Sequence, residues 1–224
     1  MAVDSIHYIS NMAKILNWNK LHKIIKDKKL LIFRPKDISC IFGVSEVAAR
    51  FFVYRHSKNR MLLRLKKDQK GSLYALADSL PSQYLIANKI YEPSYISFDT
   101  ALSHHGIIPE SIYSITSATV KATRNFTVAN ISYKYFRVKK EVYTGYKLIK
   151  YRDNTVLMAD PEKALADYLY FIALNKRGMH YERMSMKNIN RRKLMQYIHL
   201  YRYPKMLELF KELYANRRNS TRIY

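Results

Sequence analysis

Three groups of residues in this chain carry side chains that could do chemistry. The first, Asp160-Pro161-Glu162-Lys163, sets carboxylates beside a lysine, as nucleases that hold Mg²⁺ do. Those sites usually keep one residue between carboxylate and lysine on a strand, whereas here the two are adjacent. Asp160 followed by Pro161 instead predicts the start of a helix, with Asp160 as cap and Glu162 favoured by the helix dipole. We expect no catalytic residue here, and a metal-dependent nucleic-acid-processing enzyme remains the alternative.

His104 and His105 form the second group, and histidines commonly bind metal ions. Neighbouring residues of a helix point about 100° apart, so the two rings cannot easily share one ion. The chain has one cysteine, Cys40, which excludes an internal disulfide and thiolate zinc sites. We expect no metal ion and no cofactor, since the sequence also lacks a phosphate-binding glycine loop. Cys40 itself is expected to be a small buried residue.

The third group is basic and spans a predicted helix and hairpin. Gly43 stands where a helix ends with positive φ, and Ser45 can cap the next helix. A helix begun at such a turn can enter the major groove of DNA. Arg50 is the best candidate for a base contact, because a guanidinium can bond both acceptors of guanine. The residues expected to contact DNA are Ser45, Glu46, Arg50, Tyr54, Arg55, Lys58, Arg60, Lys66, Lys67 and Lys70.

Within this group, most members are expected to contact phosphates rather than bases. Arg55, Lys58 and Arg60 lie near the end of the predicted helix, and the lysines lie near the hairpin tip. The whole chain has 40 Lys and Arg against 17 Asp and Glu, a net charge of +23, so association with nucleic acid is expected. The alternatives are a solvated basic face, or a general RNA-binding protein.

A second basic surface is expected near the C-terminus, where arginines and lysines alternate with tyrosines. Tyrosine rings can stack on bases and arginines can pair with phosphates. The alternative is a helical bundle with half-buried tyrosines and basic residues that face water. The candidates for this surface are Arg191, Arg192, Lys193, Arg202, Arg217 and Arg218.

The helices and strands that the sequence predicts around these groups indicate an α+β protein of two domains. Residues 1–80 are expected to form a winged helix-turn-helix, and residues 81–224 an α+β domain with a mostly antiparallel sheet and C-terminal helices. The expected helices cover 11–26, the residues from Pro35 to Gly43, those after Ser45, 95–105, those from Asp160, and two C-terminal segments separated by Pro204. The expected strands cover 30–33, 61–66, 72–76, 115–120, 126–128, 131–138, 147–151 and 155–158, with turns at 129–130 and 153–154.

Membrane association is not expected from the sequence. The chain has no run of about 20 apolar residues, the length that crosses a bilayer. Its first residues, Met1-Ala2-Val3-Asp4, lack the basic start and apolar stretch of a signal peptide. We therefore expect a cytoplasmic protein.

Three stretches in the same order resemble the AbiEi family of antitoxins, which belong to type IV toxin–antitoxin and abortive-infection systems. The first covers the predicted turn and hairpin, the second the segment before the strands, and the third the Asp-Pro helix. The matching residues are 42–45, 49–50, 53–55 and 62–65; 95–102, 106–110 and 115–117; and 159–165 with Asp167 and Tyr170. Two features depart from the family pattern: His56 replaces an apolar residue, and the tip Asp68-Gln69-Lys70 is longer.

The resemblance implies a function for each domain. The winged domain would bind inverted repeats of double-stranded DNA in its own promoter and repress its operon. The second domain would counter a partner toxin, a nucleotidyltransferase-like protein. The resemblance does not say whether the two proteins touch. A repressor whose second domain senses a small ligand is the remaining alternative.

Overall fold

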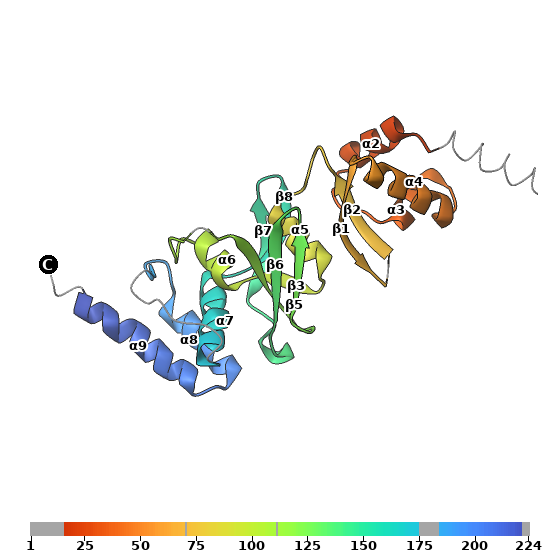
Figure 1. Cartoon of the computed structure of the whole chain (residues 1–224). Coiled ribbons are helices and arrows are strands. Elements are labelled where there is room, and N and C mark those ends of the chain that lie inside the picture. Colours follow the sequence, from red (N-terminus) through yellow and green to blue (C-terminus); the bar gives the residue numbers. More distant parts are fainter. Residues whose placement is uncertain (1–15, 70, 111, 175–183, 221–224) are drawn as a thin grey trace, which may run out of the picture. The chain divides into compact units, whose positions relative to one another are not determined.

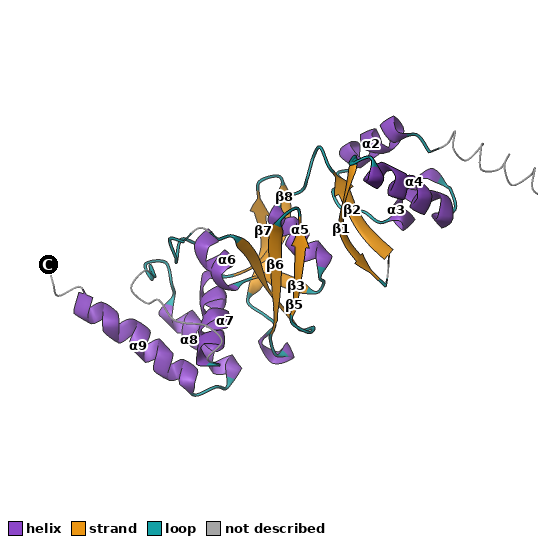
Figure 2. Cartoon of the chain, viewed as in Figure 1, coloured by secondary structure: helices purple, strands orange, loops and turns teal. Residues whose placement is uncertain are grey.

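The architecture is α+β, as the sequence predicts (Figure 2). The computed structural model describes residues 16–69, 71–110, 112–174 and 184–220, and leaves out the side chains of residues 216–220. The chain divides between Ser82 and Gln83 into two compact units, called unit 1 and unit 2 below. Among the described residues, no helix has both the length and the apolar character needed to cross a membrane.

The described residues of unit 1 form three helices and an antiparallel hairpin (Figure 1). Its elements are α2 (Trp18–Asp27), α3 (Pro35–Phe42), α4 (Glu46–Lys58), β1 (Leu62–Asp68) and β2 (Gly71–Leu76). The helices pack on the hairpin through one apolar core, whose fully buried centre includes Leu21, Phe33, Ile38, Ala49 and Val53. Burial of these side chains, each contributing about 1.5–3 kcal/mol when large, holds α4 in a fixed position.

The predicted elements of unit 1 are confirmed except for one strand. Residues 30–33 form no strand, and only Phe33 pairs, in an isolated bridge to Tyr74. Phe33, the last residue of this apolar run, fills the core. Lys29, just before the run, takes positive φ and turns the chain. The first helix was predicted to begin at residue 11, which lies outside the described residues; α2 is capped by Asn17. Cys40 was wrongly expected to be buried: it is exposed on α3.

Unit 2 is built on a six-stranded mixed sheet, with strand order β5-β6-β4-β3-β8-β7. Three neighbouring pairs run antiparallel, and two, β3–β8 and β4–β6, run parallel, so the sheet is mixed with antiparallel pairs in the majority, as predicted. Its strands are β3 (Ser94–Ile96), β4 (Ser114–Thr119), β5 (Arg124–Val128), β6 (Ile131–Arg137), β7 (Tyr146–Tyr151) and β8 (Asn154–Ala159). Its helices are α5 (Gln83–Ile90), α6 (Phe98–His104), η1 (Lys140–Val142), α7 (Pro161–Ala173), α8 (Arg191–Tyr201) and α9 (Lys205–Ser220).

Helices cover both faces of this sheet (Figure 2). On one face, the Tyr135 hydroxyl of β6 donates to the Ala87 carbonyl of α5 at 2.6 Å. On the other face, the next residue of the strand, Phe136, packs edge-on against Phe98 of α6 and Phe171 of α7. Successive strand residues point to opposite faces, so one strand holds both helical layers. Helix α7 is buried along almost its whole length as a result.

Two predictions in unit 2 are wrong in detail, and one helix was not predicted. Residues 95–105 were expected to form one helix, but the chain forms strand β3, then Phe98 at positive φ, then α6. Helix α5 was not predicted, although Ile86 and Ile90 are buried at helical spacing. The β7–β8 turn was placed one residue late: Arg152 takes positive φ, and Asn154 already pairs with Tyr151 in the ladder. The turn at residues 129–130 is confirmed, and both residues have positive φ.

Candidate nucleic-acid interface

Helix α4 is fixed at its start by two local devices that the sequence predicts. Gly43 ends α3 with φ of 64°, the left-handed conformation that glycine adopts without strain. The Ser39 hydroxyl donates to the Val44 carbonyl at 2.6 Å and holds the turn closed. Ser45 then caps α4 by accepting a hydrogen bond from the Ala48 N–H at 3.2 Å. Such a cap contributes about 1 kcal/mol to helix stability, so α4 begins at a defined residue.

The inner side of α4 packs into the core of unit 1. Ala49 and Val53 are fully buried and Phe52 nearly so. His56 completes this side: its ring stacks on Trp18 of α2 with centroids 4.9 Å apart, and its Nδ1–H donates to the Phe52 carbonyl at 2.8 Å. The histidine therefore fills the place of an apolar residue with a flat ring whose polar nitrogen is satisfied within its own helix.

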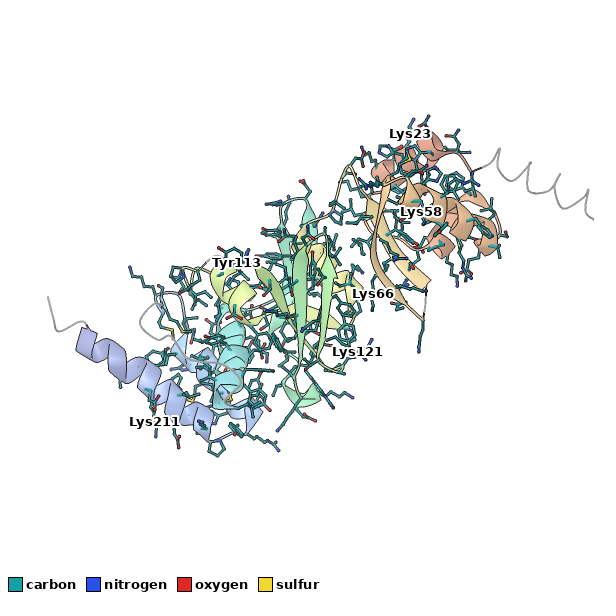
Figure 3. The ribbon with its side chains drawn as sticks, viewed as in Figure 1. Lys23, Lys58, Lys66, Tyr113, Lys121 and Lys211 are labelled. Atoms are coloured by element: carbon teal, nitrogen blue, oxygen red, sulfur yellow. The ribbon has the colours of Figure 1, made fainter. Side chains whose placement is uncertain are left out.

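The outer side of α4 is exposed and mostly basic. All the predicted residues on this helix and its two ends are exposed: Ser45, Glu46, Arg50, Tyr54, Arg55, Lys58 and Arg60. Lys58, seen in Figure 3, lies 5.6 Å from the centre of the Tyr54 ring. Arg50 donates to Glu46 at 2.6 Å, one turn earlier. An exposed pair of this kind contributes only about 0.3–0.5 kcal/mol, so it leaves Arg50 free to exchange its partner for a ligand.

Sequence reasoning missed two apolar residues on the same outer side. Val47 is 59% exposed and Phe51 is 68% exposed, beside Tyr54 at 55%. The spacing of four and three residues places them in one stripe along the helix. The signal was available, because residues 49, 52 and 53 already account for the inner side. Unless the buried side of a helix is assigned first, all of its apolar residues are predicted to lie in the core.

The hairpin presents fewer of its predicted lysines than expected. Lys66 is held back: its side chain is only 14% exposed and its ammonium lies 3.4 Å from Asp68. Asp68 also accepts two hydrogen bonds from the Arg34 guanidinium, at 3.1 and 3.2 Å. A register shift between Arg64 and Lys66 inserts an extra residue into β1, and exposes Arg64 and Lys67 instead. Lys70 lies outside the described residues.

The two carboxylates of the nuclease-like segment in unit 2, Asp160 and Glu162, form ion pairs with lysines. Asp160 begins α7 but makes no capping hydrogen bond through its side chain, contrary to prediction. Its carboxylate binds Lys193 at 2.8 Å and Lys147 at 3.4 Å. Burial alone would raise the pKa of Asp160, but the hydrogen bond and charge of Lys193 outweigh it and the pKa is lowered. Glu162 accepts from the Asn190 backbone N–H at 2.9 Å and also pairs with Lys193, so both carboxylates anchor α8.

Next to these pairs lies a buried polar cluster that sequence reasoning did not find. Asp167 accepts from the Lys163 ammonium at 2.5 Å, the Ser97 hydroxyl at 2.6 Å and the Tyr95 hydroxyl at 3.0 Å. The Tyr201 hydroxyl also donates to Asp167, and Lys163 reaches that hydroxyl at 3.0 Å. All five side chains are buried. The cluster joins β3, α7 and α8, and Lys163 is therefore structural in its contacts.

Alkaline unfolding is expected to follow from the buried tyrosines. Burial raises the pKa of Tyr95 and Tyr201 well above 10, and the neighbouring Asp167 charge adds to it; burial also raises the pKa of Tyr133 to about 12. Because the folded pKa exceeds the unfolded value near 10, this stability is fully present below pH 10 and is lost as the pH rises through the folded pKa. Urea midpoints measured from pH 8 to pH 11.5 should therefore fall above pH 10. A constant midpoint across that range would contradict the burial of these rings.

The residues predicted for the second basic surface differ in their exposure and partners. Lys193 does not belong to it, because its ammonium is committed to Asp160 and Glu162. Arg191 lies over the rings of Phe210 and Tyr214 of α9, at 5.5 and 4.9 Å. Arg192 and Arg202 are exposed. The side chains of Arg217 and Arg218 lie outside the described residues.

The histidine pair contacts protein groups rather than forming a ligand set. His105 Nε2–H donates to the Ala159 carbonyl at 2.8 Å. Burial lowers the pKa of His104, and the charge of His105 lowers it further. In the part of the chain that the structure describes, no three His, Cys, Asp or Glu side chains gather closely enough to hold a metal ion.

Comparison with known proteins returns no match, either to a model of a protein family or to a curated protein.

Proposed function

We propose that unit 1 is a winged helix-turn-helix that binds double-stranded DNA, with α4 as the recognition helix and β1–β2 as the wing. The observation that carries this proposal is the outer side of α4, where Arg50, Arg55 and Lys58 are exposed on a helix fixed by its own cap and core. The major groove is about 12 Å wide and admits an α-helix. Exposed Arg64 and Lys67 on the hairpin extend the positive charge toward a second part of the duplex.

The full chain acts, in this proposal, as a cytoplasmic antitoxin that represses its own operon through promoter inverted repeats. Unit 2 would counter a nucleotidyltransferase-like toxin encoded beside it, as the resemblance to the AbiEi antitoxins implies. Enzymatic cleavage of nucleic acid is the weaker proposal, since Asp160 and Glu162 are paired with Lys193 and Lys163 is buried against Asp167. Both carboxylates would have to leave Lys193 before they could hold a metal ion.

Replacing Arg50 by alanine tests the recognition helix. If Arg50 contacts a guanine, the change should weaken binding by about 1–3 kcal/mol and relax the preference at one base position. The measurement is equilibrium binding of the full chain to its own upstream DNA and to single-base variants of that duplex. Arg124→Ala, which removes an exposed arginine of β5 in unit 2, is the matched control and should leave base preference unchanged. Equal weakening on every duplex would make Arg50 a phosphate contact instead.

The antitoxin half of the proposal needs a separate test. The full chain is co-expressed with a nucleotidyltransferase-like protein encoded by the adjacent gene, and growth is measured. The wild type and the Arg50→Ala variant should both restore growth, because the protective function belongs to unit 2. Absence of such a neighbour, or no restored growth, would remove the antitoxin assignment and leave DNA binding standing.

A further inference from the structure

In the part of unit 1 that the structure describes, an apolar stripe on the outer side of α4 remains largely exposed. It is formed by Val47, Phe51 and Tyr54, three large side chains that are each more than half exposed. A single exposed apolar residue is common on protein surfaces, but three in one row on one helix leave a continuous apolar strip in water. The core of unit 1 is already filled by the opposite side of the same helix. The stripe is therefore available for a ligand.

Charge around the stripe narrows the choice of ligand. Arg50 lies between Val47 and Phe51 along the helix, and Arg55 and Lys58 flank Tyr54. Glu46 is the one acidic residue of α4, and the three cations Arg50, Arg55 and Lys58 outnumber it, so the helix stays positive when Arg50 exchanges Glu46 for a base. A ligand for this face must offer negative charge on its outside and apolar groups between the charges. The major groove has that arrangement, with phosphates along its edges and the C5-methyl groups of thymine projecting from its floor.

We infer that Val47 and Phe51 recognise thymine C5-methyl groups in the major groove, so that this chain prefers sites with thymines next to the base contacted by Arg50. The inference rests on the proposed DNA-binding function and adds its base preference. Val47 and Phe51 lie one turn apart, which is about 6 Å along the helix axis and spans neighbouring base pairs. Tyr54, one turn further with Lys58 over its ring, lies where the helix leaves the groove and contacts the backbone.

Replacing thymine by uracil tests this directly, since it removes the methyl group and keeps the base pair. The full chain first selects a duplex from an unmodified random pool, and the selected duplex is then made with deoxyuridine at single thymine positions. Each methyl group that is contacted should contribute about fourfold in affinity, the value for one buried apolar carbon. In a double-mutant cycle, Phe51→Ala should abolish the loss at its own thymine, and Val47→Ala the loss at a neighbouring position.

One control variant and one stability measurement test whether the uracil effect belongs to Val47 and Phe51. Tyr113→Ala removes another exposed aromatic ring, 94% exposed in unit 2 and labelled in Figure 3, and should leave the uracil effect intact. Both α4 variants should unfold like the wild type, because their side chains lie outside the core. Thermal unfolding of each variant verifies this before binding is measured.

The outcomes are distinct. No enriched sequence in the selection would overturn the proposed sequence-specific function itself. An enriched sequence that is insensitive to uracil, or one whose uracil effect is the same in Phe51→Ala, would overturn the thymine inference while DNA recognition stands. Unchanged DNA affinity in Phe51→Ala together with a change in oligomeric state, measured by sedimentation, would assign the stripe to a protein interface instead.

Discussion

Lys163→Met is expected to destabilise unit 2 by about 3–5 kcal/mol, the cost of leaving one buried charge without its partner. Asp167 is fully buried, and loss of the ammonium would leave its carboxylate with only the hydroxyls of Tyr95, Ser97 and Tyr201. Those donors hydrogen-bond to the carboxylate but do not neutralise it. The measurement is urea unfolding followed by far-UV and tyrosine near-UV circular dichroism. Trp18, the one tryptophan, lies in unit 1, so its fluorescence follows that unit separately.

Two matched variants show whether the loss comes from the buried charge. Lys163→Met combined with Asp167→Asn should recover part of the stability, because asparagine carries no charge and its side-chain carbonyl can still accept from the buried hydroxyls. Lys193→Met breaks the partly exposed pairs with Asp160 and Glu162 and should cost less, about 1 kcal/mol. If Lys163→Met kept the wild-type midpoint for unit 2, the charge at Asp167 would not depend on Lys163.

Local signals account for what the sequence predicted correctly. Gly43 and Ser45 fix the turn before α4 through their own backbone and side-chain geometry, and neither needs a distant residue. The same holds for Pro161 at the start of α7 and for the two positive-φ residues between β5 and β6. The exposed positions of Arg50, Tyr54 and Arg55 follow from the burial of residues 49, 52 and 53 on one helix.

Long-range contacts account for what the sequence did not predict. Strand β3 is three residues long and exists because β4 and β8 pair with it from later in the chain. The local pattern around Tyr95 has helical spacing and gives no sign of those partners. Lys66 was predicted at the hairpin tip, but its exposure depends on a bulge in β1 and on Asp68, which Arg34 also binds.

The buried cluster around Asp167 shows both kinds of signal. Lys163 and Asp167 are four residues apart on one helix, a spacing that the sequence displays. The sequence does not show that these two residues are buried. Their burial depends on Tyr95 and Ser97, about 70 residues earlier, and on Tyr201, 34 residues later. The segment was therefore interpreted from its Asp-Pro start alone, and the cap predicted for Asp160 was replaced by a pair with Lys193.

Binding of the full chain to its DNA should fall about 500-fold between 50 and 200 mM salt. Five exposed cations on α4 and the hairpin are expected to contact phosphates: Arg55, Lys58, Arg60, Arg64 and Lys67. Each neutralised phosphate releases counterions and adds about −0.9 to the slope of log affinity against log salt. Five contacts give a slope of about −4.5. Over the fourfold rise from 50 to 200 mM salt, this slope lowers the affinity about 500-fold.

Single substitutions assign that slope to unit 1. Lys67→Ala should reduce it by about 0.9 on every duplex, because a phosphate contact carries no sequence information. Arg50→Ala should instead relax base preference with little change in slope, if its partner is a guanine. Lys150→Ala, which removes an exposed lysine from β7 in unit 2, should leave both quantities unchanged. A slope that responds to Lys150 but not to Lys67 would move the nucleic-acid contact to unit 2 and leave α4 without the role proposed for it.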